Sequence, residues 1–153
     1  MLFRLRSLRI ATTVLALTTL AACSKKDTVT PTPTSSQSMA WTVDGANVTA
    51  NVVTPVVSGS NILISGSTTG TPTTTVLMSL PKAAGTYQIS ASSVAAISYS
   101  TGGSNGQSYP GTSGTIVVSS LSANNAAGTF TFSGSNSTNT TKAITNGTFS
   151  VSF

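Results

Sequence analysis

The chain contains no histidine and no glutamate, and its three arginines all lie within the first nine residues. The only carboxylates are Asp27 and Asp44. Acid–base and nucleophilic catalysis depend mostly on histidine, paired carboxylates and activated lysine or cysteine. Hard cations need several oxygen ligands, which one carboxylate in the globular part cannot supply. We therefore expect a protein that is not an enzyme and that holds no cofactor and no metal.

Positive charge is scarce once the N-terminal arginines are set aside. Four lysines then stand against the two aspartates. Two of them, Lys25 and Lys26, follow the single cysteine, where they suit contact with anionic lipid headgroups. This small excess of positive charge does not predict binding to nucleic acid.

The single cysteine, Cys23, excludes disulfides and cysteine–metal sites within one chain. It follows Leu20, Ala21 and Ala22, which end an apolar run that begins at Ile10. The run is too short to span a bilayer, and a basic start, an apolar segment and small residues are typical of a secretory signal. We expect residues 1–22 to be a lipoprotein signal peptide, with Leu20–Ala22 as its lipobox and Cys23 as the lipidated residue.

Residues 23–38 are rich in Ser, Thr and Pro and have no apolar periodicity. Thr30–Thr34 alternates Thr with Pro, which favours an extended path, so this segment is expected to be a tether. Asp27-Thr28-Val29 resembles the acceptor motif for protein O-glycosylation in Bacteroidota, which makes Thr28 a candidate modification site. Ser24 after the cysteine suits sorting to the outer membrane.

From residue 39 to residue 153 the dominant period is two, and Gly, Pro, Asn and Ser bound the apolar runs. Nothing sustains a helical period, and only Ala91–Ala96 suggests a helical turn. This pattern predicts a single all-β domain, an antiparallel β-sandwich or flattened barrel of about eight or nine strands. The expected strands are Ala40–Val43, Asn47–Val53, Asn61–Ser65, Thr74–Leu80, Thr86–Ser90, Ala96–Ser100, Thr115–Leu121, Thr129–Ser133 and the closing segment Lys142–Phe153.

The last two expected strands alternate hydroxyl residues with apolar ones, which predicts one shared buried face. That face consists of Phe130, Phe132, Phe149, Val151 and Phe153. Within the closing segment, Asn146-Gly147 indicates a bulge rather than a turn.

Asp44-Gly45 lies between the first two expected strands and is a strong signal for a hairpin turn. Turn formation therefore explains Asp44 better than chemistry does.

Several short motifs follow the lipobox and the tether in a fixed order. They are Trp41–Gly45, Gly85–Tyr87, Gly114–Val118, Gly128–Phe132 and Ile144–Phe149. In this order they resemble a family of small uncharacterised lipoproteins from Bacteroidota, across Met39–Phe153. The resemblance implies a β architecture and an envelope location, and no activity. The chain departs from usual members at Leu121–Asn125, which lacks their acidic residue, so no ion-related role is expected.

Ser79-Leu80-Pro81-Lys82 matches the Ser-x-x-Lys pattern of penicillin-recognising enzymes. That chemistry needs a helix start, whereas Pro81 interrupts this interval and no Lys-Thr-Gly partner exists. The motif is expected to be a junction between a strand and a turn. A hydrolase that uses a hydroxyl nucleophile with Lys82 or Lys142 is a third and least favoured interpretation of the chain.

Tyr99 and Tyr109 flank a segment rich in Gly, Ser and Asn that includes Asn105. Aromatic faces beside amides and hydroxyls can bind sugars or peptides, so these three residues form a candidate ligand or partner loop. The competing interpretation places Trp41 in the core and the tyrosines as caps on a sheet edge.

The sequence favours a non-enzymatic, lipid-anchored protein of the cell envelope. We expect it at the outer membrane, where it meets another envelope protein or a surface glycan. The alternative is a carbohydrate- or peptide-binding accessory module at the cell surface. In either case the membrane is reached through the lipid anchor.

Overall fold

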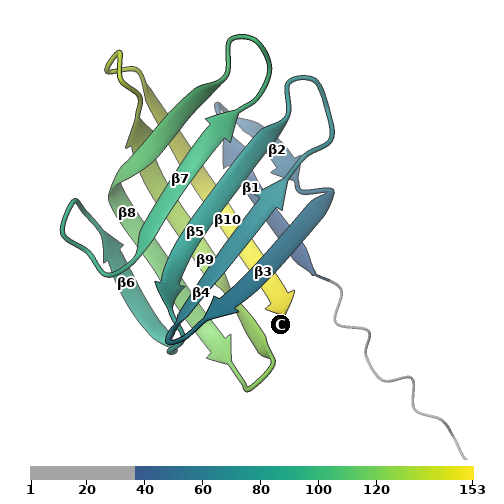
Figure 1. The fold of residues 1–153 in the computed structure, drawn as a ribbon. Helices are drawn as coiled ribbons and strands as arrows, with labels where there is room; N and C mark the ends of the chain where they lie inside the picture. The colour runs from purple at the N-terminus through teal and green to yellow at the C-terminus, as the bar shows by residue number, and fades with distance from the viewer. Residues whose placement is uncertain (1–36) are drawn as a thin grey trace, which may run out of the picture. The chain divides into compact units, whose positions relative to one another are not determined.

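The computed structural model describes residues 37–153, and every regular element in this range is a β-strand (Figure 1). The predicted all-β class is therefore confirmed. In chain order the strands are β1 (Ser38–Val43), β2 (Ala46–Thr49), β3 (Val52–Ser58), β4 (Asn61–Ser67), β5 (Thr74–Pro81), β6 (Gly85–Ile89), β7 (Ala96–Thr101), β8 (Gln107–Leu121), β9 (Asn125–Ser135) and β10 (Thr141–Ser152).

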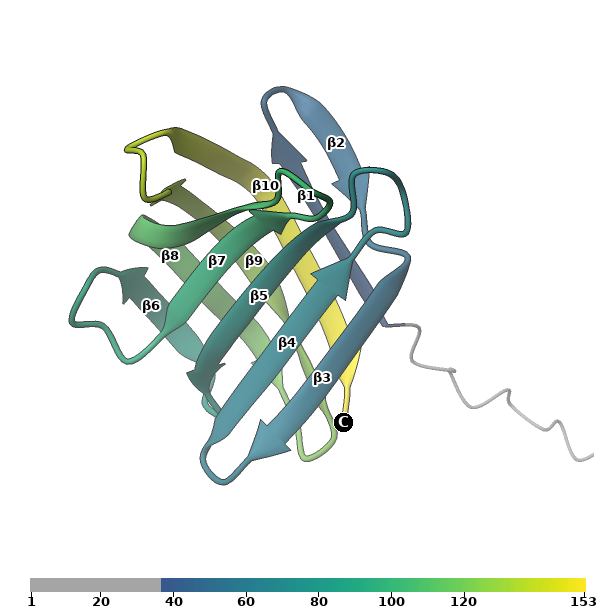
Figure 2. The same ribbon diagram turned by 45° about the horizontal axis from the view of Figure 1, so that its top comes forward.

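The strands form one antiparallel sheet that curls into a half-barrel of two facing layers (Figures 1 and 2). The order is β2-β1-β10-β9-β8-β7-β5-β4-β3, with β6 paired to β8 beside this path. One layer holds β2, β1, β10 and β9, and the other holds β7, β5, β4 and β3. The long strand β8 belongs to both, because its first part pairs with β7 and its later part pairs with β9, with β6 on the other side of that later part.

The core lies between the two layers and is almost entirely aliphatic and aromatic. Phe130, Phe132, Phe149 and Val151 are buried on one face, as the alternation predicts, while Phe153 is half-buried. Trp41 is buried in the same core. The remaining large core side chains are Met39, Val43, Ile62, Ile64, Val76, Met78, Leu80, Ile89, Ile97, Tyr99, Tyr109, Ile116, Val118 and Ile144.

A turn and a bulge form where the sequence predicts them. Asp44 and Gly45 both have positive φ, 52° and 80°, and join β1 to β2 as a two-residue hairpin turn. Asn146, with φ of 50°, lies in a bulge between Ile144 and Gly147. A Cβ on Gly147 would lie 2.4 Å from the Phe130 ring, so only glycine fits at that side of the bulge.

The expectation of a single strand over Asn47–Val53 is wrong. β2 ends at Thr49, and a second strand, β3, begins at Val52. The chain crosses from one layer to the other at residues 50 and 51. Ala50 N–H donates to the Met39 carbonyl at 2.9 Å, and Asn51 N–H donates to the Ser67 carbonyl at 2.8 Å. β3 follows this crossing as an edge strand, which explains how it accommodates Pro55.

Strand β8 begins earlier than the alternation suggests. Gln107–Pro110 pairs with β7, whereas the expected strand begins only at Thr115. Gly111 and Gly114 interrupt the apolar alternation at the point where β8 passes between the layers. The segment Ala91–Ala96 contains turns and no helix, with Ser93 N–H donating to the Ser90 carbonyl at 3.2 Å.

The domain has two distinct ends. The first described residue, Gln37, donates through its side chain to the Ser152 carbonyl at 3.1 Å, so the start of the domain and its last strand end lie together. We call this the terminal end. The opposite end, called the loop end, carries the connections at residues 44–45, 68–73, 102–106 and 136–140.

Replacing Phe132 with alanine tests the buried face of β9. Removing this buried ring should lower the free energy of unfolding by about 3–5 kcal/mol, close to the whole stability of a small domain. Thr131→Ala, at the exposed neighbouring position, should cost less than half as much. Urea denaturation monitored by circular dichroism measures both variants. Equal losses would contradict a single buried face.

Candidate functional site

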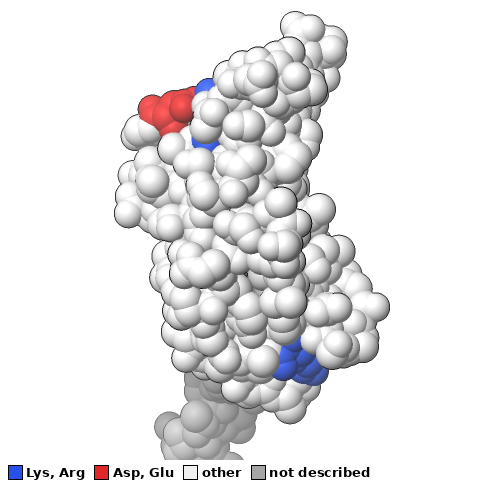
Figure 3. Space-filling view, turned by 90° about the vertical axis from the view of Figure 1, so that its left-hand side faces the viewer, with Lys and Arg blue, Asp and Glu red and all other residues white. Residues whose placement is uncertain are grey.

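The loop end brings together most of the ionisable side chains of the described domain. Only Asp44, Lys82 and Lys142 carry charge in residues 37–153. Lys142 at the start of β10 donates to the Asp44 carboxylate in the β1–β2 turn, and the two form an ion pair. Figure 3 shows acidic and basic groups together at one end of the domain and a separate basic group at the other.

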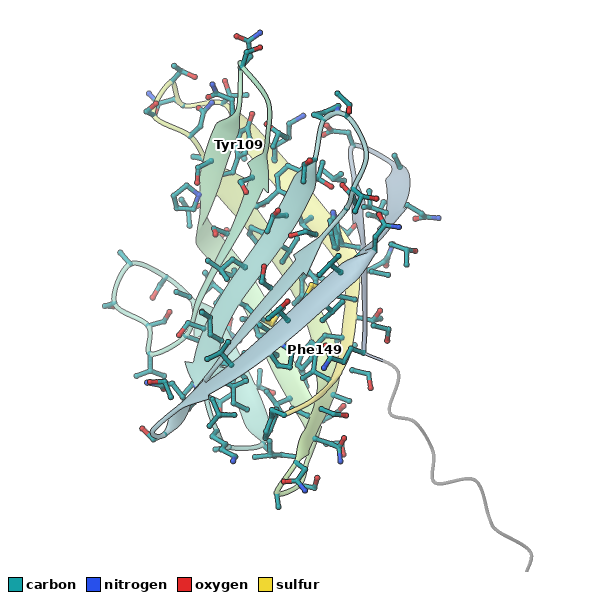
Figure 4. The ribbon with its side chains drawn as sticks, turned by 45° about the vertical axis from the view of Figure 1, so that its right-hand side comes forward. Tyr109 and Phe149 are labelled. Carbon is teal, nitrogen blue, oxygen red and sulfur yellow. The ribbon has the colours of Figure 1, made fainter. Side chains whose placement is uncertain are left out.

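Tyr99 and Tyr109 close the core at the loop end. They face each other across β7 and β8, with ring centroids 5.9 Å apart and ring planes tilted by 34°. Both side chains are buried, so their rings are not displayed on a loop surface. Figure 4 shows Tyr109 near the loop end and Phe149 deeper along the sheet. Trp41 thus lies in the core, as the competing sequence interpretation places it. The tyrosines do not cap a sheet edge, because β7 and β8 are interior strands and both rings belong to the core.

The surroundings of Tyr99 and Lys142 raise the pKa of each side chain, so both are protonated at neutral pH. Burial raises the pKa of Tyr99; the Lys142 charge opposes this rise and the Asp44 charge adds to it. The hydrogen bond to Asp44 raises the pKa of Lys142, while desolvation acts in the opposite direction. A protonated amine and a neutral phenol cannot serve as bases at neutral pH. Neither Tyr99 nor Lys142 therefore supplies a general base at neutral pH.

A cleft of about 350 Å³ opens between the β4–β5 and β7–β8 loops. Its wall is built from Thr71, Pro72, Thr101, Gly102, Gly103, Ser104 and Asn105. The structure thus places Asn105 in a cleft, apart from the two buried tyrosine rings. Every polar side chain in this wall is a hydroxyl or an amide, and none is charged.

Hydrogen bonds of the backbone, with itself and with side chains, fix the loops around this cleft. Gly102 N–H donates to the Thr73 carbonyl at 2.7 Å and ties one loop to the other. Thr73 Oγ1 donates to the Gly70 carbonyl at 3.2 Å, and Thr74 N–H donates to Thr68 Oγ1 at 2.9 Å. The cleft is therefore largely preformed, which reduces the entropy lost when a ligand binds.

Asn136 organises the neighbouring β9–β10 loop, a role that the sequence analysis does not anticipate. Its side-chain carbonyl accepts from Thr138 N–H at 3.1 Å and Thr140 N–H at 2.8 Å, and its amide donates to Gln107 at 3.0 Å. Asn136 is buried. The available signal is an Asn-x-Thr spacing, which is a weak signal in a chain so rich in these residues.

Ser79 and Lys82 do not form a catalytic pair. Ser79 lies within strand β5, opposite Leu63 of β4. The Lys82 amine lies at the terminal end, 4.9 Å from the centre of the Phe153 ring and 3.4 Å from the Ala123 carbonyl. The backbone forms the expected junction between a strand and a turn, because β5 ends at Pro81.

Within residues 37–153 no group of three or more metal-ligating side chains occurs. In the same range no helix is long and apolar enough to cross a membrane. The predicted lipobox Leu20–Ala22, the lipidated Cys23 and the candidate glycosylation site Thr28 lie outside the described residues.

Alkaline titration tests the coupling among Tyr99, Lys142 and Asp44. Because both raised pKa values mean that the folded state holds protons more tightly than the unfolded chain, stability should fall as pH rises above about 10. Lys142→Met should raise the pKa of Tyr99 further, and Asp44→Asn should lower it. Phenolate absorbance measures this, and Tyr99→Phe identifies the transition. The opposite order of the two variants would contradict the geometry.

Comparison with known proteins supplies a family and no activity. No curated protein and no solved structure matches the chain. Residues 35–151 match a family described as a domain of unknown function, DUF6252, which agrees with the resemblance to an uncharacterised family. The match covers nearly all of the described β domain, and the chain therefore belongs to the DUF6252 family.

Proposed function

We propose that this protein is a non-enzymatic, lipid-anchored component of the bacterial cell envelope that acts by binding another envelope component. The observation that carries the proposal is the chemistry of the loop end. Its amine and its carboxylate are paired with each other, and the adjoining cleft has only neutral hydroxyl and amide groups. Such a surface can recognise a partner but has no free acid–base pair.

The anchoring part of the proposal rests on the sequence from Leu20 to Cys23 and on the basic, apolar segment before it. Lys25 and Lys26 support it, since they suit contact with anionic headgroups. Ser24 favours the outer membrane as the destination. Gln37, the first described residue, lies at the terminal end, and the proposed partner surface lies at the opposite end of the domain.

Cys23→Ala tests the anchor directly. The change should abolish fatty-acid labelling and release the protein from the membrane fraction, because no other cysteine can accept the thioether-linked lipid. Ser24→Ala is the matched control and should remain labelled. Labelling that survives Cys23→Ala would overturn the proposed anchor.

A second candidate function is the binding of a neutral carbohydrate or a short peptide in the loop-end cleft. The cleft volume of about 350 Å³ lies within the usual range for small-molecule sites. Threonine and serine hydroxyls, the Asn105 amide and the Pro72 ring offer hydrogen bonds and one apolar contact. The absence of charge in this wall disfavours phosphorylated ligands.

Asn105→Ala tests this second candidate on an array of neutral oligosaccharides. Loss of the amide should weaken binding by about 5-fold to 10-fold, the effect expected when one hydrogen bond is lost. Asn124→Ala, an exposed asparagine at the terminal end, is the matched control and should bind normally. Equal binding by both variants would exclude the cleft as the site.

A further inference from the structure

The outer side of the β3-β4-β5-β7 layer carries exposed aliphatic side chains. Val56 and Leu63 are directly opposite each other on β3 and β4, and Leu77 lies on the neighbouring strand β5. Leu63 and Leu77 are each 39% exposed, and Val52 at the start of β3 is 52% exposed. We call Val52, Val56, Leu63 and Leu77 the aliphatic face. Val56, Leu63 and Leu77 are contiguous, because Val56 faces Leu63 and both leucines line one hollow. Contiguous exposed apolar side chains on a rigid sheet are typical of an interaction surface.

A hollow of about 200 Å³ lies within this face. Small side chains, Ser79, Ala96 and Ser98, form its floor, and Leu63, Leu77 and Pro110 stand around it. The strand register explains this shape, because Ser79 lies between Leu63 and Ala96 on adjacent strands. The hollow is apolar at its rim and can accept a side chain of moderate size.

Val94 provides a side chain of that kind. It is 77% exposed, the most exposed large hydrophobic residue of the described domain. It lies two residues before Ala96, in the connection between β6 and β7. The Ser93 hydroxyl donates to the Ser90 carbonyl at 3.2 Å and also contacts the Ala95 carbonyl, so the connection is held in place. Val94 is therefore presented to solvent by an ordered turn.

We propose that the aliphatic face is an interface between two copies of this chain, with Val94 of each copy in the hollow of the other. A two-fold axis makes both contacts at once, because each copy offers the same projection and the same hollow. This inference is independent of the proposed anchor and of the loop-end cleft.

Charge favours a second copy over a charged partner. None of the three charged side chains of residues 37–153 belongs to the aliphatic face or to the hollow. Two lysines and one aspartate leave the described domain with a formal charge of only +1, so two copies repel each other weakly.

The edge of the layer does not offer an easier route to the same dimer. β3 is an edge strand, and Pro55 at its centre lacks the N–H that strand addition would use. Packing of one face on another avoids this difficulty. The proposed interface is therefore formed by contacts between side chains and not by extension of the sheet.

A photocrosslinking amino acid placed singly at Val94 or at Leu77 of the full chain, in native membranes, tests the interface. Both positions should yield a product of twice the mass of the chain. The same probe at Thr131, exposed on β9 in the other layer, is the control and should give none. Absence of the doubled product at both positions, a product of another mass, or equal yield from Thr131 would each overturn the proposal.

Sedimentation equilibrium of the purified full chain gives a second measurement. Val94→Ser should weaken the dimer at least about tenfold, because each dimer loses two buried valine side chains. The change lies at an exposed position, so an unchanged circular dichroism spectrum is expected and establishes that the variant folds. Unaltered self-association, or a monomeric parent protein, would contradict the interface.

Discussion

The passage of β8 from one layer to the other is the constraint on which the rest of the structure depends. A Cβ on Gly111 would lie 2.8 Å from the Ile97 carbonyl oxygen, and one on Gly114 would lie 2.2 Å from the Thr131 carbonyl oxygen. Gly114 also has φ of 140°, which side chains rarely tolerate. Without these two glycines the layers could not share a strand, and the core between them would open along one side.

The same passage creates the loop end. Because the first part of β8 pairs with β7, Tyr109 comes to face Tyr99, and the two rings close the core beside Asp44 and Lys142. The pairing of β5 with β7 brings the β7–β8 loop against the β4–β5 loop, where Gly102 bonds to Thr73. The candidate cleft forms between these two loops, beside the end of the core that the tyrosines close.

The sequence predicts elements well where burial alternates regularly. Phe130, Phe132 and Phe149 predict their strands and their face because each neighbouring position is a hydroxyl residue. Asp44-Gly45 and Asn146-Gly147 predict a turn and a bulge because only a few residues accept positive φ. These signals are local, so one sequence is enough to read them.

Other features depend on contacts between distant segments and leave no local signal. Strand β3 contains Pro55, which is typical of a strand end or a turn until the position at the sheet edge is known. Tyr99 and Tyr109 flank a polar segment, so the sequence alone allows display on a loop as readily as burial. Only the pairing of β7 with β8 decides between the two. Asn105 and the hollow beneath Leu63 and Leu77 likewise become sites only when separate loops and strands meet. In a domain with three charged side chains, the proposed recognition would rest on shape and neutral hydrogen bonds, and shape is the property that a local sequence pattern describes least.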